Sequence, residues 1–155
     1  MTKLSDYQEF LENIRIPIRL ACKTESGWPM VLSLWFIYKD RSLYCATRSS
    51  ARVVSYLSKN AECAFEVAAD QPPYCGIRGQ ALASIDQHRG GEILGLLLDR
   101  YLGGRESALA ETLLKNSADE VAIRLDPVKI FSWDFSERMK GIGPGTDLLS
   151  SKVCP

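Results

Sequence analysis

Histidine is nearly absent from this sequence, because His88 is the single one among 155 residues. A histidine-ligated metal site and a serine–histidine–aspartate triad are therefore both disfavoured. The sequence also lacks a Gly-x-Gly-x-x-Gly motif and a Walker-type loop, which are the phosphate-binding signatures of dinucleotide-binding and P-loop folds. We expect no metal site and no Rossmann fold.

An excess of charge of one sign is absent as well. The 19 lysine and arginine residues equal the 19 aspartate and glutamate residues in number, so the chain offers no general attraction to nucleic acid or to an anionic membrane. No segment reaches the roughly 18 consecutive apolar residues of a membrane-spanning helix, and residues 1–10 are too polar for a signal peptide. These absences predict a cytoplasmic protein that binds neither nucleic acid nor membranes.

The cysteines follow neither a metal-binding nor a disulfide-rich pattern. The sequence has five, an odd number, with wide spacing and no Cys-x-x-Cys pair. Three of them lie in strand-like apolar segments, where a reduced cysteine behaves as a small apolar residue. We therefore expect free, buried thiols rather than a disulfide framework or a zinc site. The five residues are Cys22, Cys45, Cys63, Cys75 and Cys154.

The composition that remains is that of a globular domain. Apolar residues make up 46% of the chain and charged residues 25%, which suffices to bury a core without cross-links. No repeat or linker interrupts the sequence, so we expect a single domain over residues 1–155 with its core at about 14–138. The tail, residues 141–155, is expected to be loose or to wrap around a partner.

Alternation of apolar and polar residues predicts strands over most of this core. Residues 28–38 are apolar on both faces, so this strand is expected to be covered on both sides. The pair Asp126-Pro127 is expected to separate the last two strands. The predicted strands are residues 16–24, 28–38, 42–47, 62–69, 74–85, 121–125 and 128–135, and the predicted helices follow a Ser5 cap and cover residues 51–59, 86–102 and 105–115.

Six or seven short strands with inserted helices are typical of a small closed or nearly closed antiparallel barrel. Gly76 and Gly79 lie inside one predicted strand. Glycines at such positions indicate a bulge, a barrel corner, or a ligand close to the backbone.

A first candidate site lies at residues 47–52, Thr-Arg-Ser-Ser-Ala-Arg, where a strand ends and a helix begins. Free N–H groups at a helix start favour an anion. The guanidinium groups of Arg48 and Arg52 can add bidentate contacts to phosphate oxygens. The alternative is a serine helix cap flanked by two solvated arginines.

A second candidate is the apolar strand over residues 28–36, with Ser33 near its centre. Backbone N–H and C=O groups along such a strand can recognise the edge of a flat, pyrimidine-like ring. The alternative is that this segment is simply a strand of the core.

The order of short motifs along the chain carries a family resemblance. An Arg-Leu-Ala strand is followed by an apolar strand ending in Leu-Trp-Phe, a Leu-Tyr-x-x-Thr strand and a basic helix start. After these come Gly-Ile-Arg-Gly-Gln-Ala, a helical insertion, and Val-Ala-Ile-Arg-Leu-Asp-Pro-Val-Lys-Ile-Phe-Ser-Trp-Asp-Phe. The ordered set, over about residues 16–135, resembles the pyridoxamine 5′-phosphate oxidase-like, flavin-binding split-barrel superfamily.

The resemblance implies a six-stranded antiparallel split β-barrel that forms a homodimer with two cofactor sites at its interface. The cofactor would be FMN, or a deazaflavin in some branches. Arg52 would bind the phosphate, and Trp133 would pack near the ring from the other subunit. The residues that would line the cofactor are Met30, Val31, Leu32, Ser33 and Leu34 along the ring, with Ala46, Thr47, Arg48 and Ser49 near the ring and phosphate.

The sequence departs from the family pattern at three places. Val53 stands where a lysine often follows the phosphate arginine, so either Arg48 supplies the missing charge or the phosphate is held more weakly. Tyr74 stands where the true oxidase has glutamine. Residues 138–140, Arg-Met-Lys, replace the arginine–x–histidine pair that contacts the pyridoxal substrate. The resemblance therefore does not imply oxidation of pyridoxamine phosphate.

The first hypothesis for function is an FMN-binding oxidoreductase whose substrate enters near Tyr74 and Arg78, with a small molecule or a nicotinamide as electron donor. The second is a cofactor-binding, electron-carrying module that has no small-molecule substrate of its own. The third is a structural or regulatory dimer with an empty site. Reduction by NAD(P)H would separate the first two.

Overall fold

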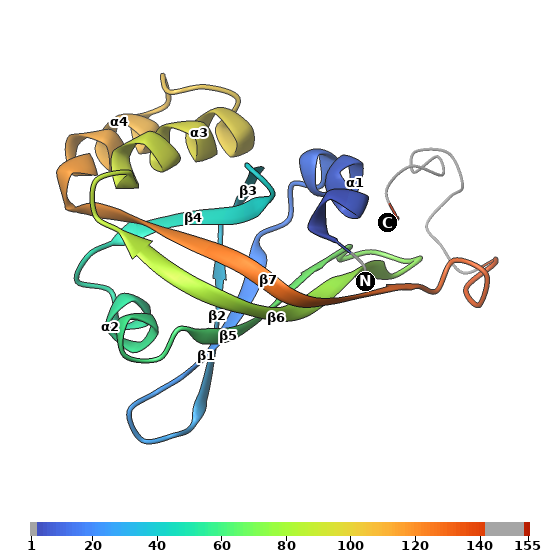
Figure 1. Cartoon of the computed structure of the whole chain (residues 1–155). Helices are drawn as coiled ribbons and strands as arrows, with labels where there is room; N and C mark the ends of the chain where they lie inside the picture. The colour runs from blue at the N-terminus through green and yellow to red at the C-terminus, as the bar shows by residue number, and fades with distance from the viewer. Residues whose placement is uncertain (1–2, 142–153) are drawn as a thin grey trace.

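The computed structural model describes residues 3–141 and 154–155, and its main feature is one antiparallel sheet flanked by helices (Figure 1). The prediction of a mainly β fold with peripheral helices is confirmed. The expectation for the tail falls largely on residues 142–153, which lie outside the described residues. The strands are β1 (Ile18–Lys23), β2 (Pro29–Leu34), β3 (Ile37–Lys39), β4 (Ser42–Arg48), β5 (Glu62–Ala68), β6 (Cys75–Asp86) and β7 (Glu120–Asp134). The helices are η1 (Leu4–Tyr7), α1 (Gln8–Asn13), α2 (Arg52–Lys59), α3 (Gly90–Leu102), α4 (Ala108–Lys115) and η2 (Ser117–Asp119).

The strand order closes this sheet into a barrel. Hydrogen-bonded neighbours run β2-β1-β5-β6-β7-β4-β3, so β2 and β3 lie at the two opposite edges of the sheet. Only Trp35 and Phe36 separate these two strands along the chain, and three peptide steps span at most about 11 Å. The two edges of the sheet therefore meet where β2 passes into β3.

The predicted strand over residues 28–38 is thus two strands, and the sheet has seven strands in the described residues where six were expected. The break is held by helix α3. The ring of Trp35 stacks on Tyr101 with centroids 5.0 Å apart, and the Phe36 N–H donates to the Tyr101 hydroxyl at 3.3 Å. The expected cover on both faces is wrong for the single chain, because Val31 on β2 is 67% exposed.

The predicted break at Asp126-Pro127 is also wrong, because β7 runs through it without interruption. Gln80 pairs with Lys129, and the next residue, Ala81, pairs with Pro127. Val128 is therefore the extra residue of a β-bulge. Proline has no N–H to donate to the ladder, and a bulge is one of the few places in a sheet that tolerate it.

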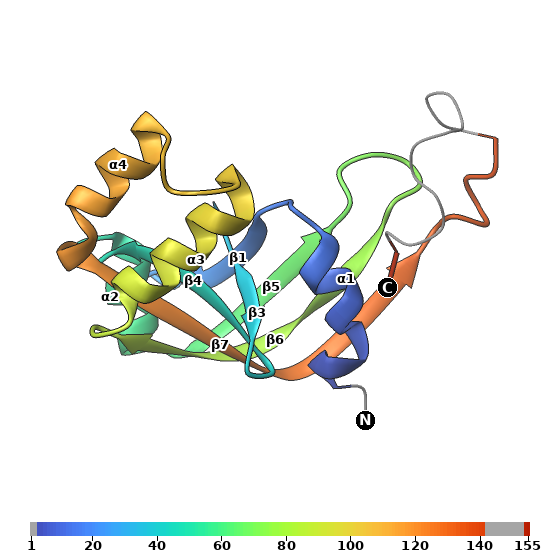
Figure 2. The same ribbon diagram turned by 90° about the horizontal axis from the view of Figure 1, so that it is seen from above.

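The inside of the barrel is the main hydrophobic core. Inward residues such as Ile18, Leu20, Phe65 and Ile77 are at most 3% exposed. Helices α1 and α2 lie at opposite ends of the barrel in both views (Figures 1 and 2). Each inserts apolar residues into the same core, and these include Phe10, Leu11, Val53, Val54 and Leu57. The barrel interior is therefore filled with side chains, and a ligand has to bind outside it.

Helices α3 and α4 cover a separate part of the sheet, outside strands β4 and β7 (Figure 2). Ile93 and Leu97 of α3 pack on Tyr44 and Ala122 of these strands. The Arg100 guanidinium donates to the carbonyl oxygens of Leu11 and Glu12 at 2.6 and 2.9 Å. This contact fixes the end of α1 to α3.

Two helix starts differ from the predicted ones, because side-chain hydrogen bonds to backbone N–H groups fix the chain near each start. Lys3 rather than Ser5 precedes the first turn, and the Lys3 N–H donates to the Asp6 carboxylate at 2.9 Å. Asp86 still belongs to β6, and its carboxylate accepts the His88 N–H at 2.9 Å, so α3 begins at Gly90. Side-chain capping of this kind competes with apolar periodicity in setting a helix boundary.

The strand glycines permit close packing of neighbouring strands rather than contact with a ligand. A Cβ atom on Gly76 would lie 2.5 Å from the Val67 carbonyl oxygen. A Cβ atom on Gly79 would lie 2.2 Å from the Lys129 carbonyl oxygen and 2.9 Å from the Phe65 ring. Of the three possibilities that the sequence left open, a bulge is present next to Gly79. The close approach of neighbouring strands is a further reason for glycine that was not predicted.

Replacing Gly79 with alanine is therefore expected to destabilise the fold by about 2–3 kcal/mol, because backbone atoms of β7 would have to move. Urea unfolding measures this loss. The matched control is Gly91→Ala in α3, where the added Cβ would lie 3.8 Å from its nearest neighbours. That change is expected to be neutral or stabilising by up to about 1 kcal/mol. Equal effects for the two variants would contradict the packing argument.

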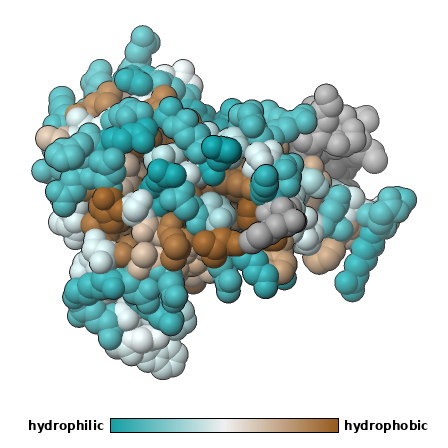
Figure 3. Space-filling view, in the orientation of Figure 1, coloured by the Kyte–Doolittle hydropathy of each residue, from teal (hydrophilic) through white to brown (hydrophobic). Residues whose placement is uncertain are grey.

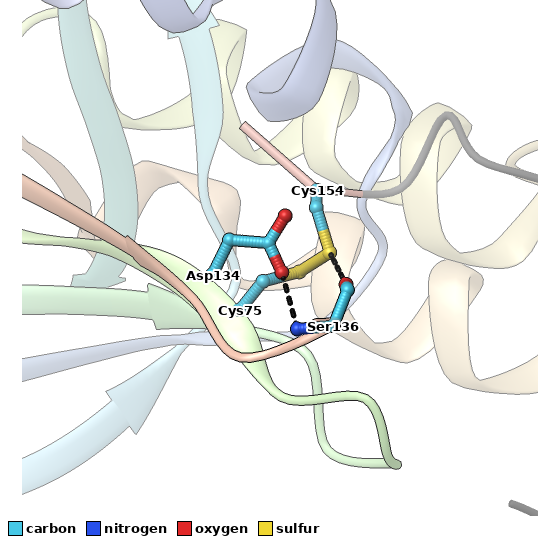
Figure 4. Close-up of a disulfide and its surroundings, with 4 residues drawn as sticks. All are labelled: Cys75, Asp134, Ser136 and Cys154. Carbon is cyan, nitrogen blue, oxygen red and sulfur yellow. Dashed lines mark hydrogen bonds between the residues drawn. A yellow bond between two sulfur atoms is a disulfide. The ribbon is translucent and has the colours of Figure 1, made fainter. Parts of the chain in front are cut away.

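The cysteine prediction is right for three residues and wrong for two. Cys22, Cys45 and Cys63 are free and buried. Cys75 and Cys154 form a disulfide, with Cα atoms 5.5 Å apart (Figure 4). The sequence could not indicate this pairing, because 79 positions separate the two residues and only the fold brings them together.

Candidate functional site

Strand pairing around the barrel is interrupted between β2 and β4, and each of these strands has an unpaired edge there. Strand β2 pairs with β1 on one side, and within the described residues no strand lies on its other side. Strand β3 covers β4 only over residues 42–44, so β4 has a free edge from Cys45 to Arg48. Because β2 leads into β3, these two free edges border the same interruption in the strand pairing, which we call the split.

Most of the predicted cofactor residues lie on the strands that border the split or at the start of α2. Met30, Val31, Leu32, Ser33 and Leu34 form β2. Thr47 and Arg48 end β4, and Ser49 and Arg52 follow at the entrance to α2. The backbone of Ala46 belongs to the β4 edge, but its side chain packs against α3 and α4. Ala46 can therefore face a ligand in the split only with its backbone.

The start of α2 has no side-chain cap. The residue at the cap position is Ala51, and no side chain accepts a hydrogen bond from the first turn of this helix. The serine cap that was the alternative interpretation is therefore wrong. Arg48, Ser49, Ser50 and Arg52 around this helix start are all exposed. The Val54 N–H donates to the Ala51 carbonyl at 3.0 Å, so within the described residues the N–H groups of Arg52 and Val53 are those that remain for a ligand from outside the chain.

The two arginines at this helix start differ in their surroundings. Arg48 is paired across the sheet with Glu120, which is 8% exposed. Burial raises the pKa of the Glu120 carboxyl, and the opposing attraction of Arg48 is the smaller effect. Arg52 has no ion pair among the described residues. Arg52 is thus the guanidinium that is more available to an anion.

Val53 does not point toward the split. Its side chain is 2% exposed and belongs to the barrel core. The position that often carries a lysine in the family is therefore a packing position in this chain. Any second positive charge at the split has to come from elsewhere, and Arg48 is the nearest one in the sequence.

A second group of predicted residues lies far from the split, at the distal end of β6 and β7. Gly76 pairs with Trp133, and the Arg78 guanidinium lies 5.5 Å from the Trp133 ring centroid. Tyr74 directly precedes β6, and its carbonyl accepts the Phe135 N–H at 3.0 Å. The predicted substrate residues Tyr74 and Arg78 are thus brought to Trp133, as neighbours on one two-stranded ribbon.

Trp133 lies at the end of β7 that is away from the split of its own chain. Across the sheet, four strand steps separate β7 from β2 and one step separates it from β4. Ala122 pairs with Ala46 beside the split, and Trp133 lies 133 − 122 = 11 residues further along β7, a path of about 35 Å. The structure therefore does not bring Trp133 together with the β2 and β4 residues within one chain.

Between the split and the ribbon, the outer face of the sheet forms a shallow groove of about 390 Å³. Arg19, Glu66 and Arg78 stand side by side across its floor as cross-strand partners. Apolar residues flank them, with Val31 at 67% and Phe131 at 48% exposure. In Figure 3, apolar surface also gathers in a band over the middle of β6 and β7.

Sequence reasoning missed Arg19, Glu66 and Phe131 of this groove. A signal was present for Arg19 and Glu66, because they occupy the outward positions of strands whose alternate residues are buried. The sequence does not reveal that these outward positions lie in line across adjacent strands.

Among the described residues, no three histidine, cysteine, aspartate or glutamate residues are grouped so as to hold a metal ion. His88 is exposed, two residues after the end of β6 and just before α3. None of the described helices is long and apolar enough to cross a membrane.

Comparison with known proteins identifies the fold. No family model matches the chain, and no curated protein matches it. A conserved hypothetical protein of Mycobacterium tuberculosis superposes with a TM-score of 0.70 at 18% identity, over 97% of this chain and 94% of that one. An F420 reductase superposes with a TM-score of 0.66 at 23% identity, over 79% of this chain and 94% of that one. A Listeria innocua protein assigned as a pyridoxamine 5′-phosphate oxidase superposes with a TM-score of 0.63 at 16% identity, over 83% of this chain and 96% of that one.

These likenesses extend over most of each chain, and they show that the chain has the split-barrel fold of pyridoxamine 5′-phosphate oxidase-like proteins. The fold resemblance expected from the ordered motifs is confirmed. At such identities the likeness concerns the fold alone, since one fold hosts many functions.

Proposed function

We propose that this split-barrel chain binds FMN or a deazaflavin at the split, as a homodimer, and carries out hydride or electron transfer. The observation that carries the proposal is the uncapped start of α2 beside Arg52, which follows the β4 edge of the split. A phosphate there would accept hydrogen bonds from the free N–H groups of the helix and from the guanidinium.

The free edge of β2 supports the position of the ring. Unpaired N–H and C=O groups at a sheet edge bind whatever offers complementary groups, and the pyrimidine edge of a flavin or deazaflavin does so. Both cofactors share this edge and the phosphate. The fold neighbours include an F420 reductase, which favours testing a deazaflavin as well as FMN.

The position of Trp133 and the exposed apolar face support the homodimer. Trp133 lies 11 residues along β7 from Ala122, which pairs with Ala46 beside the split, so we propose that it contributes to the split of a second copy of the chain. Val31, Phe131, Leu82 and Val128 are each between 46% and 67% exposed on the sheet. A second copy that covered this face would bury them, and it would carry its ribbon toward the first copy's split.

A bound flavin or deazaflavin supplies the redox chemistry itself. The chain's own residues would bind and orient it. Arg52 and the α2 amides would hold the phosphate, and the β2 amides would donate hydrogen bonds toward the ring edge and so stabilise negative charge there. Tyr74 and Arg78 on the ribbon would contact the substrate, with Arg78 favouring an electron-rich or anionic group.

The test is the absorbance spectrum of the purified protein, together with mass spectrometry of whatever heat releases. Absorbance bands near ~450 and ~370 nm with FMN released would establish a flavoprotein. A bound deazaflavin would give its absorbance band at a shorter wavelength than ~450 nm. Titration of colourless protein with FMN, with a deazaflavin, and with riboflavin, which lacks the phosphate, would follow. Failure to bind FMN and the deazaflavin would overturn the proposal.

Replacing Phe131 with aspartate is expected to weaken dimerisation by about 2 kcal/mol or more, because a central apolar contact would become a buried charge. Light scattering after size exclusion measures the mass, which is 17.3 kDa for one chain. The matched control is Leu109→Asp on α4, where the side chain is 52% exposed outside this face. A dimer that survives Phe131→Asp, or dissociates with both variants, would contradict the proposed interface.

A further inference from the structure

We propose that Cys75–Cys154 is a thiol–disulfide exchange site, at which a small thiol attacks the Cys154 sulfur and releases the chain end from the β6–β7 ribbon. The observation is the disulfide itself, which joins the first residue of β6 to the penultimate residue of the chain. Figure 4 shows it beside Asp134 and Ser136 at the end of β7.

The two cysteine residues differ in burial. Cys75 is 0% exposed, and its backbone is tied on both sides, since it pairs with Asp134 and its carbonyl accepts the Ala69 N–H at 2.9 Å. Cys154 is only half-buried, and its sulfur lies 3.8 Å from the Ser136 hydroxyl. The proposal therefore places the attack of an external thiol on Cys154 rather than on Cys75.

The exchange takes place in two steps, in which atoms and electrons balance. A thiol RSH forms a bond between its sulfur and that of Cys154, the Cys75–Cys154 bond breaks, and the proton of the thiol ends on the Cys75 sulfur. A second thiol then displaces the first from Cys154, giving RSSR and a Cys154 thiol. Two electrons pass from the two thiols to the protein disulfide. A small monothiol such as glutathione supplies both equivalents.

The other cysteines do not interfere with this exchange. Cys22, Cys45 and Cys63 lie in the barrel core. Burial raises the pKa of the Cys63 thiol to about 11, and it also raises the pKa values of Cys22 and Cys45. Three protonated thiols inside a packed core are poor nucleophiles. Reshuffling within the folded chain is therefore not expected.

Opening the disulfide would loosen the ribbon end without removing any part of the core. The Phe135 N–H donates to the Tyr74 carbonyl at 3.0 Å. Cys75 directly follows Tyr74, and its cross-strand partner Asp134 directly precedes Phe135. This inference extends the proposed function, because Tyr74 and Trp133 flank the anchored end and would lose rigidity on reduction. Its test needs no cofactor, so the two proposals can fail independently.

The experiment treats the folded, oxidised full-length protein with increasing glutathione, quenches with acid, and maps mixed disulfides by peptide mass spectrometry. The expected result is a reduction rate that rises linearly with thiol concentration, with glutathione found on Cys154. A rate that saturates at the global unfolding rate, or a mixed disulfide on Cys75 or on a core cysteine, would overturn the proposal. Failure of the reduced protein to re-form the bond with oxidised glutathione would overturn it too.

Hydrogen exchange provides the second readout. Peptides covering residues 74–77 and 132–136 are expected to exchange several-fold faster after reduction, while peptides of α3 stay unchanged. The Cys154→Ser variant should match the reduced protein whether or not a reductant is present. Unchanged exchange at the ribbon end after reduction would show that the disulfide does not anchor it.

Discussion

Replacing Arg52 with alanine is expected to weaken FMN binding about 10- to 100-fold, because a guanidinium–phosphate contact contributes about 1.5–3 kcal/mol. Arg52 is exposed, lies at the uncapped start of α2, and has no ion pair among the described residues. Its loss therefore removes a ligand contact and little else. Fluorescence titration with FMN measures the change in affinity.

Two controls separate this contact from general effects. Lys115→Ala removes a positive charge from exposed helix α4 and should leave FMN affinity unchanged. Riboflavin, which has no phosphate, should bind the Arg52→Ala variant and the parent equally well. Full FMN affinity in Arg52→Ala, or an equal loss for FMN and riboflavin, would refute the placement of the phosphate at α2.

Removal of the Cys75–Cys154 disulfide is expected to lower the free energy of unfolding by about 4 kcal/mol. The bond closes a loop with a sequence separation of 79 residues, and a cross-link of this span removes much of the conformational freedom of the unfolded chain. Urea unfolding of Cys154→Ser against the oxidised parent measures the loss.

The same variant provides the control for the reductant. Dithiothreitol should shift the unfolding midpoint of the parent to that of Cys154→Ser and should leave the variant itself unchanged. A parent protein whose midpoint does not move on reduction would show that the cross-link does not restrict the unfolded chain.

Local patterns predicted most of the elements correctly. The alternation in β5, with Cys63, Phe65 and Val67 inward, predicts the observed strand to within a residue, because side chains alternate between faces by geometry. The predictions failed where a contact with a residue distant in the sequence determines where a strand bends or ends. Val128 forms a bulge at Pro127 only because β6 lies alongside, and the strand over residues 28–38 divides at Trp35 because α3 packs there.

For the candidate site too, the predictions that depended on local sequence were correct, and those that depended on distant contacts failed. The basic segment at Arg48 and Arg52 was visible in the sequence, because a strand end followed by a helix start is a local feature. The alternative interpretation, a serine cap, is wrong, since whether a serine side chain turns back onto the helix depends on the backbone of that turn. Arg19, Glu66 and Phe131 were not identified, because their alignment across the sheet depends on strand register.

By itself, the sequence of this protein determined the fold class, the family resemblance, and the two segments from which the split is built. These follow from residue spacing along the chain. Only the tertiary structure decided that β2 and β4 border one interruption in the strand pairing, that Trp133 lies at the other end of β7 from this split, and that Cys75 meets Cys154. Each of these is a contact between distant positions, and strand pairing and barrel closure, rather than local propensity, bring such positions together.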